Sequence, residues 1–563
     1  FGARSVDILR DNPFELCQVS GFGFKRVDAI MRKNNWPLNS PMRIRGAVFA
    51  ALESAKGDGG HLYLEAEQLH KEAMSLLNSM IPVPQMRVKS DDLDAVIDDM
   101  LLQGKIINSN GNYYLVKAFA QEDETARSIA RLLCRPVERV DVQDLLTRVR
   151  RQLGVELSLR QTEAVHMVFR SDLSIITGSP GTGKTTVLKA VIEVFKLLKP
   201  SEKILLAAPT GRASRRMAES TGVDNASTLH SLLGLYGEEG GFRKGEEDML
   251  DAGLIIVDES SMMDMWLARK FFSRIGPDTK VLLVGDADQL QSVGAGDVFR
   301  ELINCGLIPV TVLNEIFRQK KDSLIAYNAQ KINNNDTSFF YGNDFTVCKC
   351  ANQEEAAEHI RNIYLAQVKQ YGVDRVQILS PFRSTGAASA DQLNEAIREL
   401  VNPQTEEADL KVGSLYFRVG DKIMQNKNST KASNGDIGFI RSFRHDERDG
   451  MRISIQFSPT RVVEYSMEEM GHVELAYATT VHKAQGSEFD VVIFPLLRSH
   501  ARMLTRSLIY TAITRAKAKV ILVGQIGMLY MAVHKDDTGK RNTQLGRRIA
   551  LYVNTFKVQQ RSA

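Results

Sequence analysis

One short stretch limits what this chain can fold into more than any other: Gly178-Ser179-Pro180-Gly181-Thr182-Gly183-Lys184-Thr185. It follows the G-x-x-x-x-G-K-[ST] pattern of a phosphate-binding loop. A β-branched apolar run, 173–177, precedes it, and apolar residues on a helical period follow it over 186–195. In such a loop the backbone N–H groups and the N-terminus of the next helix face a triphosphate. The sequence therefore predicts a strand, a nucleotide-binding loop and a helix, in that order.

Side chains in and beside this loop indicate the cofactors. We expect Lys184 to reach the β- and γ-phosphates and the Thr185 hydroxyl to ligate Mg²⁺. Gln161 lies just before the strand, where its amide can form paired hydrogen bonds with N6 and N7 of adenine. The expected cofactors are therefore ATP and Mg²⁺, bound by the loop 178–185 together with Gln161 and Thr186.

Apolar runs farther along the chain predict more strands of the same sheet. The run 254–257 ends in Asp258 and Glu259. Asp258 can hold the hydration shell of Mg²⁺, and Glu259 can orient or deprotonate the attacking water. The next run, 280–284, delivers Gln289 to the γ-phosphate. Strands that alternate with helices predict a right-handed, mostly parallel α/β sheet whose site lies at the carboxyl ends of the strands.

The chain as a whole fits a multidomain globular protein. Its 563 residues suggest about four domains, and 43% hydrophobic with 25% charged residues is an ordinary globular composition. No apolar run approaches the roughly 18 residues of a membrane span. A net charge of +4 permits a nucleic-acid partner without requiring one. The chain begins at Phe1 rather than Met, so we expect it to be part of a longer protein.

The cysteines point to a cytoplasmic location rather than to a metal site. Cys348-Lys349-Cys350 lacks the C-x-x-C spacing and has no second ligand pair nearby. Reduced structural thiols are the preferred interpretation. The five cysteines are Cys17, Cys134, Cys305, Cys348 and Cys350.

The N-terminal region is predicted to be mainly helical. Two apolar helical stretches surround Gly21-Phe22-Gly23 and resemble a helix-hairpin-helix, in which loop amides grip DNA phosphate and Lys25 and Arg26 assist. A plain αα-corner that binds nothing is the alternative. Helices over 41–78, interrupted at 56–61, and a helix over 91–104, followed by a hairpin over 106–115, suggest a winged-helix-like unit. This unit is as consistent with a packing module as with a DNA-binding one.

Several motifs together resemble one family. Asp258-Glu259-Ser260-Ser261-Met262 and the run 285–290 are similar to motifs of superfamily 1 helicases. The runs 208–214 and 227–234 resemble the RecD branch specifically. The N-terminal glycines near residue 22 and the run 60–64 resemble the stand-alone RecD-like helicases of superfamily 1B, rather than the RecD subunit of RecBCD. The resemblance covers nearly the whole chain.

The resemblance implies two RecA-like P-loop motor lobes with ATP between them. Hydrolysis then needs an arginine finger from across the cleft. Arg318 lies in a run that resembles helicase motif IV, and Arg515 lies in one that resembles motif VI. Apolar runs at 376–380, 490–494 and 519–524 are the predicted parallel strands of the second lobe.

The stretch 477–490 resembles motif V, which would touch both ligands. Gly486 and Glu488 are expected to face the nucleotide. The predicted DNA contacts on this side are Thr480, His482 and Lys483, and those of the first lobe are Pro209, Thr210, Arg212, Thr228 and His230. For Arg212, a solvated surface cation is the alternative.

The family resemblance also suggests domain boundaries. Short alternating runs over 402–474 predict a small antiparallel β-barrel inserted in the second lobe, over the DNA channel. A hairpin at about 236–247 corresponds to the family's strand-separating pin, but it is short and acidic at its tip, so a surface loop is the alternative. The expected domains are an N-terminal domain (1–153), lobe 1A (154–312), lobe 2A (313–401 and 475–563) and the barrel (402–474).

We therefore predict a monomeric, ATP-dependent DNA helicase. The resemblance implies 5′–3′ movement on single-stranded DNA and unwinding of duplexes with a 5′ tail, in DNA repair or recombination. Phosphate and stacking contacts imply little sequence preference. Two alternatives stay open: an ATP-switched DNA- or protein-binding module that does not unwind, and a DNA-independent kinase or NTPase. The sequence does not identify protein partners and shows no nuclease metal cluster.

Overall fold

The computed structural model describes residues 10, 12–18, 22–136, 140–223, 226–236, 241–242, 248–315, 323–405, 409–446, 450–536 and 541–562. Two sequence predictions fall outside these ranges. Arg318 is one, and residues 237–240 and 243–247 of the expected pin are the other. Within the described ranges, no helix has the length and apolar character needed to cross a bilayer.

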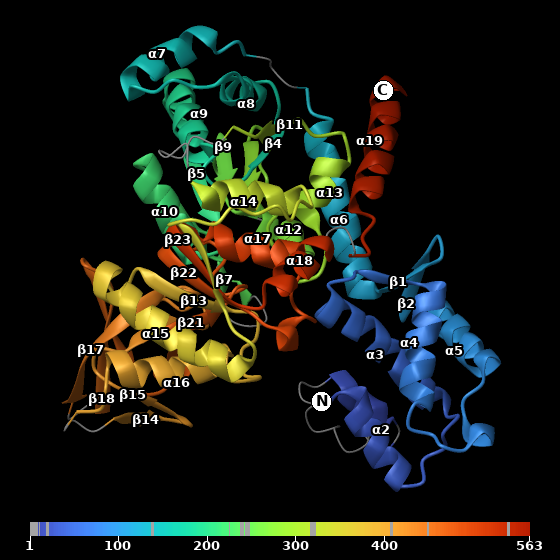
Figure 1. Cartoon of the computed structure of the whole chain (residues 1–563). Coiled ribbons are helices and arrows are strands. Elements are labelled where there is room, and N and C mark those ends of the chain that lie inside the picture. The colour runs from blue at the N-terminus through green and yellow to red at the C-terminus, as the bar shows by residue number, and fades with distance from the viewer. Residues whose placement is uncertain are drawn as a thin grey trace.

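The first lobe is a six-stranded, wholly parallel sheet in the order β11-β4-β10-β9-β5-β6. Its strands are β4 (Leu173–Gly178), β5 (Ile204–Ala208), β6 (Ala226–Thr228), β9 (Leu254–Val257), β10 (Lys280–Gly285) and β11 (Val310–Leu313). The flanking helices are α8 (Leu159–Phe169), α9 (Lys184–Leu198), α10 (Gly211–Thr221), α11 (Leu229–Leu232), α12 (Met265–Phe272) and α13 (Val298–Asn304). Helices cover the sheet on both faces (Figure 1), which is why its central strands are buried aliphatic runs.

The second lobe repeats this architecture with a five-stranded parallel sheet in the order β12-β23-β22-β13-β21. Its strands are β12 (Phe345–Lys349), β13 (Val376–Ser380), β21 (Ala478–Thr480), β22 (Phe489–Leu496) and β23 (Ala516–Gly524). Its helices are α14 (Leu324–Asn333), α15 (Gln353–Tyr371), α16 (Ala390–Val401), α17 (Arg506–Thr514) and α18 (Ile526–His534). The two sheets confirm the α/β fold class with two lobes.

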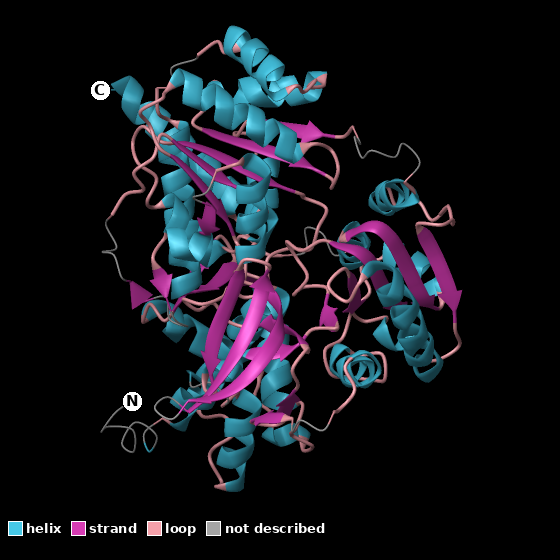
Figure 2. Ribbon diagram, turned by 90° about the vertical axis from the view of Figure 1, so that its left-hand side faces the viewer, coloured by secondary structure: helices cyan, strands magenta, loops and turns pink. Residues whose placement is uncertain are grey.

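An antiparallel unit interrupts the second lobe between α16 and β21 (Figure 2). Five strands pair in the order β19-β18-β17-β16-β20 and surround a small core of their own that includes Ile423, Ile453 and Tyr465. A two-stranded ladder of β14 and β15 lies beside them. The strands are β14 (Leu410–Val412), β15 (Leu415–Phe417), β16 (Lys422–Gln425), β17 (Ile437–Asp446), β18 (Gly450–Ser458), β19 (Arg461–Ser466) and β20 (Val473–Leu475).

The N-terminal region contains helices and one three-stranded antiparallel sheet, β1-β3-β2. The helices predicted over 41–78 break at the expected interruption, because α3 ends at Gly59 and the chain leaves it through Gly60 in the left-handed conformation. The strand β1 (Tyr63–Glu65), which pairs with β3 before α4 begins, was not predicted. The other elements are α2 (Phe24–Lys33), α3 (Pro41–Gly59), α4 (Ala66–Asn78), α5 (Ser90–Leu102), β2 (Ile106–Ser109), β3 (Asn112–Leu115), α6 (Val116–Leu133) and α7 (Gln143–Leu153).

The last helix, α19 (Leu545–Ser562), packs against α6 and not against the second sheet (Figure 1). Its Leu545 and Ile549 belong to the core shared by the N-terminal region and the first lobe. Buried Glu122 of α6 accepts hydrogen bonds from Thr543 Oγ1 (2.7 Å) and from Arg548 Nε (3.1 Å). The C-terminal segment therefore ties the N-terminal region to the motor.

Candidate functional site

The glycine loop joins β4 to α9, as the sequence predicts. Gly181 and Gly183 have φ angles of 87° and 81°, a conformation that glycine adopts without strain. A Cβ on Gly178 would lie 2.5 Å from the backbone oxygen of Leu313, so β11 packs too close for a side chain there. Lys184 Nζ donates hydrogen bonds to the carbonyl oxygens of Gly178 and Ser179. The loop carbonyls thus hold Lys184 at the N-terminus of α9, where a bound phosphate could replace them as the hydrogen-bond acceptor.

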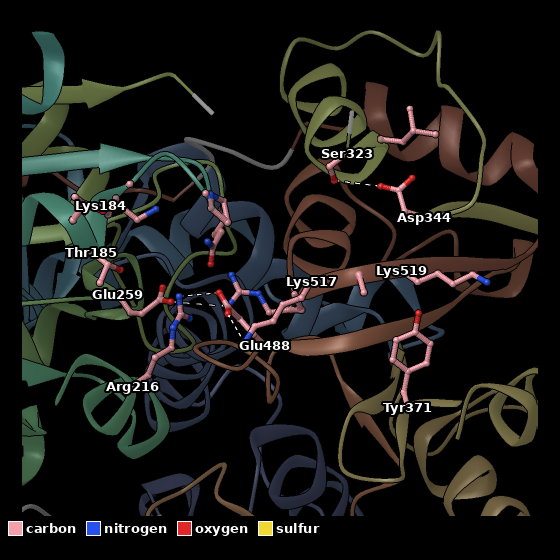
Figure 3. Close-up of a pocket in the computed structure, with 18 of the residues that line it drawn as sticks. Lys184, Thr185, Arg216, Glu259, Ser323, Asp344, Tyr371, Glu488, Lys517 and Lys519 are labelled. Carbon is pink, nitrogen blue, oxygen red and sulfur yellow. Dashed lines mark hydrogen bonds and ion pairs between the residues drawn. The ribbon is translucent and has the colours of Figure 1, made fainter. Parts of the chain in front are cut away.

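A cavity of about 1300 Å³ lies between the two lobes in front of this loop (Figure 3). The first lobe contributes Pro180, Gly181, Gly183, Lys184, Thr185, Thr186, Arg216, Asp258, Glu259 and Gln289 to its wall. The second lobe contributes Asp344, Tyr371, Glu488, Arg515, Lys517 and Lys519, among others. Of the remaining predicted loop residues, Gly178, Ser179 and Thr182 border a second cavity of about 330 Å³ behind the loop.

The two predicted acids lie at the end of β9. Burial, and then repulsion from Glu259, raises the pKa of Asp258 to about 6, while Lys184 and Arg216 oppose this rise. Glu259 has a left-handed backbone (φ 52°), an unusual conformation for a residue with a side chain, of the kind found at active sites. Asp258 and the Thr185 hydroxyl both border the cavity and supply the oxygen ligands that Mg²⁺ prefers. These residues fit a magnesium ion that takes its other ligands from water and phosphate.

Arg515 reaches from the second lobe to Glu259, the residue predicted to orient or deprotonate the attacking water. It lies at the end of α17, is 2% exposed, and its Nη1 is 3.9 Å from Glu259 Oε1. The same nitrogen donates to the backbone oxygen of Ser487 (3.3 Å). The structure therefore brings this predicted finger to the first lobe's catalytic edge. The other predicted finger, Arg318, lies outside the described residues.

Glu488 lies at the same seam and pairs with a cation from each lobe. Its carboxylate is 2.8 Å from Arg216 of α10 and 3.2 Å from Lys517 of β23 (Figure 3). Burial alone would raise the pKa of Glu488, but Arg216, Lys517 and Arg515 together lower it below its usual value. Glu488 therefore stays ionised and holds the lobes together.

Gln289 borders the cavity from a loop that the second lobe holds in place. Its amide donates to Asp286 (3.0 Å), and Asp286 also accepts from the Tyr510 hydroxyl (2.8 Å). Thr511 Oγ1 accepts from the backbone N–H of Leu290 (2.9 Å). Closure of the lobes and the position of Gln289 are thereby linked.

Gln161 is buried beneath the loop and does not border the cavity. Its amide donates to the Thr182 oxygen (3.3 Å) and accepts from the backbone N–H of Ser158 (3.0 Å), which completes a capping box on α8. These bonds brace the phosphate loop from behind.

A separate groove of about 310 Å³ lies between the lobes and the antiparallel unit. Six of the predicted DNA contacts border it: Pro209, Thr210, Arg212, His230, His482 and Lys483. Residues that the sequence analysis did not select also border it: Asp264 and Trp266 of the first lobe, and Asn426, Asn428 and Asn434 of the antiparallel unit. The predicted residues, which are more than 200 positions apart in the chain, therefore meet around one groove.

Thr228 and Thr480 lie next to the groove but not in its wall. Thr228 caps α11 by accepting from Ser231 N (3.0 Å), which fixes His230 in the first turn of that helix. The His230 ring packs at 6.0 Å from that of Trp266, and its buried Nδ1 has no hydrogen-bond partner among the residues that the structure describes. Burial lowers the pKa of His230, so its ring is neutral at pH 7.

Two of the predicted cations in the groove are engaged within the protein. Lys483 Nζ pairs with Glu474 and donates to Asn426 Oδ1 (3.1 Å). The Arg212 guanidinium lies 4.9 Å from the centre of the Phe489 ring and donates a hydrogen bond to the backbone oxygen of Glu488 (3.3 Å). Arg212 is therefore not a solvated surface cation, because it joins α10 to the second lobe.

Gly486 is placed differently from the sequence prediction. It is absent from the wall of the nucleotide cavity, and a Cβ on it would lie 2.7 Å from Thr210 Oγ1. Its positive φ (71°) lets the loop that contains it lie against Thr210, the N-cap residue of α10. Glycine is required at this position because two loops meet there.

Comparisons with known proteins agree with this geometry. Four family models match: an AAA domain (residues 161–295), a UvrD-like helicase C-terminal domain (475–523), an ATP-dependent RecD-like DNA helicase SH3 domain (393–457) and an ATP-dependent RecD2 DNA helicase HHH domain (1–63).

Full-length relatives are also similar. The chain is 31% identical over 561 residues to the ATP-dependent RecD2 DNA helicase of Deinococcus radiodurans. This match covers 98% of this chain and 74% of that protein. It is 28% identical to the RecBCD enzyme subunit RecD of Mycolicibacterium smegmatis, over 67% of this chain and 72% of that one. Among solved structures, the Pif1 helicase from Candida albicans is 18% identical, with a TM-score of 0.43, over 72% of this chain and 99% of that chain.

Proposed function

This chain belongs to the RecD-like family of ATP-dependent DNA helicases, and we propose that it moves 5′ to 3′ along single-stranded DNA and unwinds duplexes that carry a 5′ tail. Mg²⁺-ATP hydrolysis in the cavity before the glycine loop drives this movement. The direction rests on family membership. A role in DNA repair or recombination, a monomeric state and a cytoplasmic location are parts of the same proposal.

One observation carries the proposal: the nucleotide cavity and the groove share the seam between the lobes. Helix α10 and the loop before β22 reach both. Thr210, at the start of α10, borders the groove, whereas Arg216 of the same helix borders the nucleotide cavity. The motif V loop likewise supplies Lys483 to the groove and Glu488 to the cavity. A change in one ligand therefore displaces elements that touch the other.

Each residue of the cavity has a proposed role in hydrolysis. Lys184 leaves its carbonyl acceptors to bind the β- and γ-phosphates. Thr185 and Asp258 would hold Mg²⁺, which neutralises charge on the phosphates when bound. Glu259 accepts a proton from the attacking water while Gln289 orients it. Arg515, with Arg318 of motif IV, supplies positive charge that compensates the transferring phosphoryl group.

The groove residues have proposed roles in holding the strand. Thr210, Thr228, Thr480 and His482 offer hydrogen bonds to phosphate and sugar, which carry no sequence information. Lys483 exchanges Glu474 for a phosphate when DNA enters. The grips in the two lobes alternate as ATP closes the seam and hydrolysis reopens it. The proposed domain boundaries are those expected from the sequence, except that the last helix, α19, packs with the N-terminal region and the first lobe rather than with lobe 2A. The pin at about 236–247 is the proposed wedge.

The test compares duplexes with a 5′ tail, a 3′ tail or blunt ends, each with and without ATP. Unwinding of the 5′-tailed duplex alone, together with ATP hydrolysis that single-stranded DNA stimulates, is the expected result. Unwinding of the 3′-tailed duplex would overturn the direction. ATP turnover without strand separation would favour a switch module instead.

A further inference from the structure

Three arginines of α10 reach across the seam to different targets. Arg212 donates to the backbone of Glu488, and Arg215 forms a bidentate pair with the fully buried carboxylate of Asp436 in the antiparallel unit. Arg216 pairs with the Glu488 carboxylate at 2.8 Å. Arg212 and Arg215 do not border the nucleotide cavity, whereas Arg216 does.

The surroundings of Arg216 are those of a phosphate-binding cation. It lies in the same wall as Lys184, Thr185 and Glu259 (Figure 3). Its side chain is 46% exposed although it is paired, so it faces open cavity rather than packed protein.

Glu488 does not depend on Arg216 for neutralisation. Lys517 of the second lobe lies 3.2 Å from its other carboxylate oxygen. If Arg216 moved away, Glu488 would keep a cationic partner, so the exchange would leave no buried, unpaired charge. An arginine in this position can therefore move between a carboxylate and a phosphate at small electrostatic cost.

We propose that Arg216 binds the terminal phosphate of ATP from the first lobe, and that Glu488 holds it in reserve until the triphosphate arrives. The inference rests on the proposed function, since it assigns a ligand within the same nucleotide cavity. It adds a cation in the same lobe as the glycine loop to the arginine finger that the second lobe supplies. Because Thr210, the N-cap of α10, borders the groove, movement of Arg216 toward the phosphate would also shift a predicted DNA contact.

The experiment measures nucleotide affinity without DNA by calorimetry, for ADP and for a non-hydrolysable ATP analogue. Arg216→Ala is expected to lower the affinity for the analogue about tenfold, because one charge-assisted contact is lost. The affinity for ADP should fall less than about twofold. Arg216→Lys should recover part of the loss because it keeps the charge without the fork. Arg215→Ala is the matched control: it breaks a neighbouring contact across the same seam, so both affinities should stay within about twofold of the unaltered protein.

Equal loss for ADP and the analogue, or no loss for either, would overturn the inference. The inference would also be overturned if Arg215→Ala lowered the affinity for the analogue as much as Arg216→Ala does, since both arginines would then act only through the contact between the lobes. If Arg216→Ala does not fold, Arg216→Lys and Arg216→Gln decide by the same ratio of analogue to ADP affinity. The unaltered protein is assayed in parallel for unwinding of the 5′-tailed duplex. Failure there counts against the helicase proposal, whereas normal unwinding with unchanged discrimination counts against Arg216 alone.

Discussion

The nucleotide cavity and the proposed DNA groove are built by the same two lobes, but their walls differ in charge. The cavity gathers Lys184, Arg216, Asp258, Glu259 and Arg515, with further charged groups from the second lobe. Three asparagines and two histidines border the groove beside Thr210 and Trp266, and its two basic residues, Arg212 and Lys483, are engaged within the protein. We therefore expect chemistry on the nucleotide side to depend on a few charges, and binding of a strand in the groove to be spread over many weaker contacts. Substitutions should accordingly have large effects in the cavity and modest ones in the groove.

The largest effect is expected from Arg515→Ala. This change removes the positive charge that the second lobe brings to Glu259, and we expect kcat for ATP to fall about 10³-fold. Affinity for ADP should change little, because the finger acts on the transferring phosphoryl group. Steady-state ATPase assays with saturating single-stranded DNA measure the effect. A fall of less than tenfold would mean that Arg515 has only a structural role.

Lys184→Ala is expected to lower kcat about 10²-fold, the usual effect of losing one group that stabilises charge in a transition state. Nucleotide affinity should fall as well, since Lys184 binds the phosphates in the ground state. Fluorescence anisotropy with a labelled single strand is the control, and DNA affinity without nucleotide should be unchanged. Loss of DNA binding in this variant would contradict the proposal that the cavity binds the nucleotide and the groove binds the DNA strand.

In the groove, Lys483→Ala is expected to weaken single-stranded DNA binding about tenfold. The slope of log affinity against log salt should become shallower by about 0.7, the contribution of one phosphate contact. Basal ATPase activity without DNA should remain. A salt slope identical to that of the unaltered protein would show that Lys483 stays with Glu474 when DNA is bound.

The smallest effect is expected from Trp266→Ala. Its indole borders the groove beside His230, where a base can stack, and we expect about fivefold weaker binding at every salt concentration. Trp266→Phe, which keeps an aromatic face, should recover most of the affinity. A variant with reduced salt dependence would instead point to a lost phosphate contact.

The sequence predicted the parts of the fold that local patterns specify. The glycine loop, its strand and its helix follow from one continuous motif, and the buried runs of β9, β10 and β22 are long enough to recognise. The strands β1, β6 and β11 were missed because they lie at sheet edges and are only partly buried, so their short runs are not continuously apolar; β9 has four residues like β11, but all four are buried aliphatic residues. The docking of α19 onto α6 leaves no local pattern either, because it depends on contacts such as that of Arg548 with Glu122.

For the site, sequence motifs selected residues that the structure brings together around two cavities. They did not select Arg216 or Lys517, because the role of each depends on Glu488 of a distant segment. A signal was present: Arg212 and Arg216 are four residues apart, so they share one face of α10. Gly486 was expected at the nucleotide, together with Glu488, because the stretch 477–490 resembles motif V. The loop turns between the two residues and places Gly486 against Thr210.

The claim that both ligands share one seam has a direct thermodynamic test. Single-stranded DNA affinity is measured with and without a saturating non-hydrolysable ATP analogue, and affinity for the analogue is measured with and without saturating DNA. Since coupling between two binding sites is reciprocal, both ratios should be equal, and we expect a factor of about five or more. Ratios of one in both directions would contradict the shared seam.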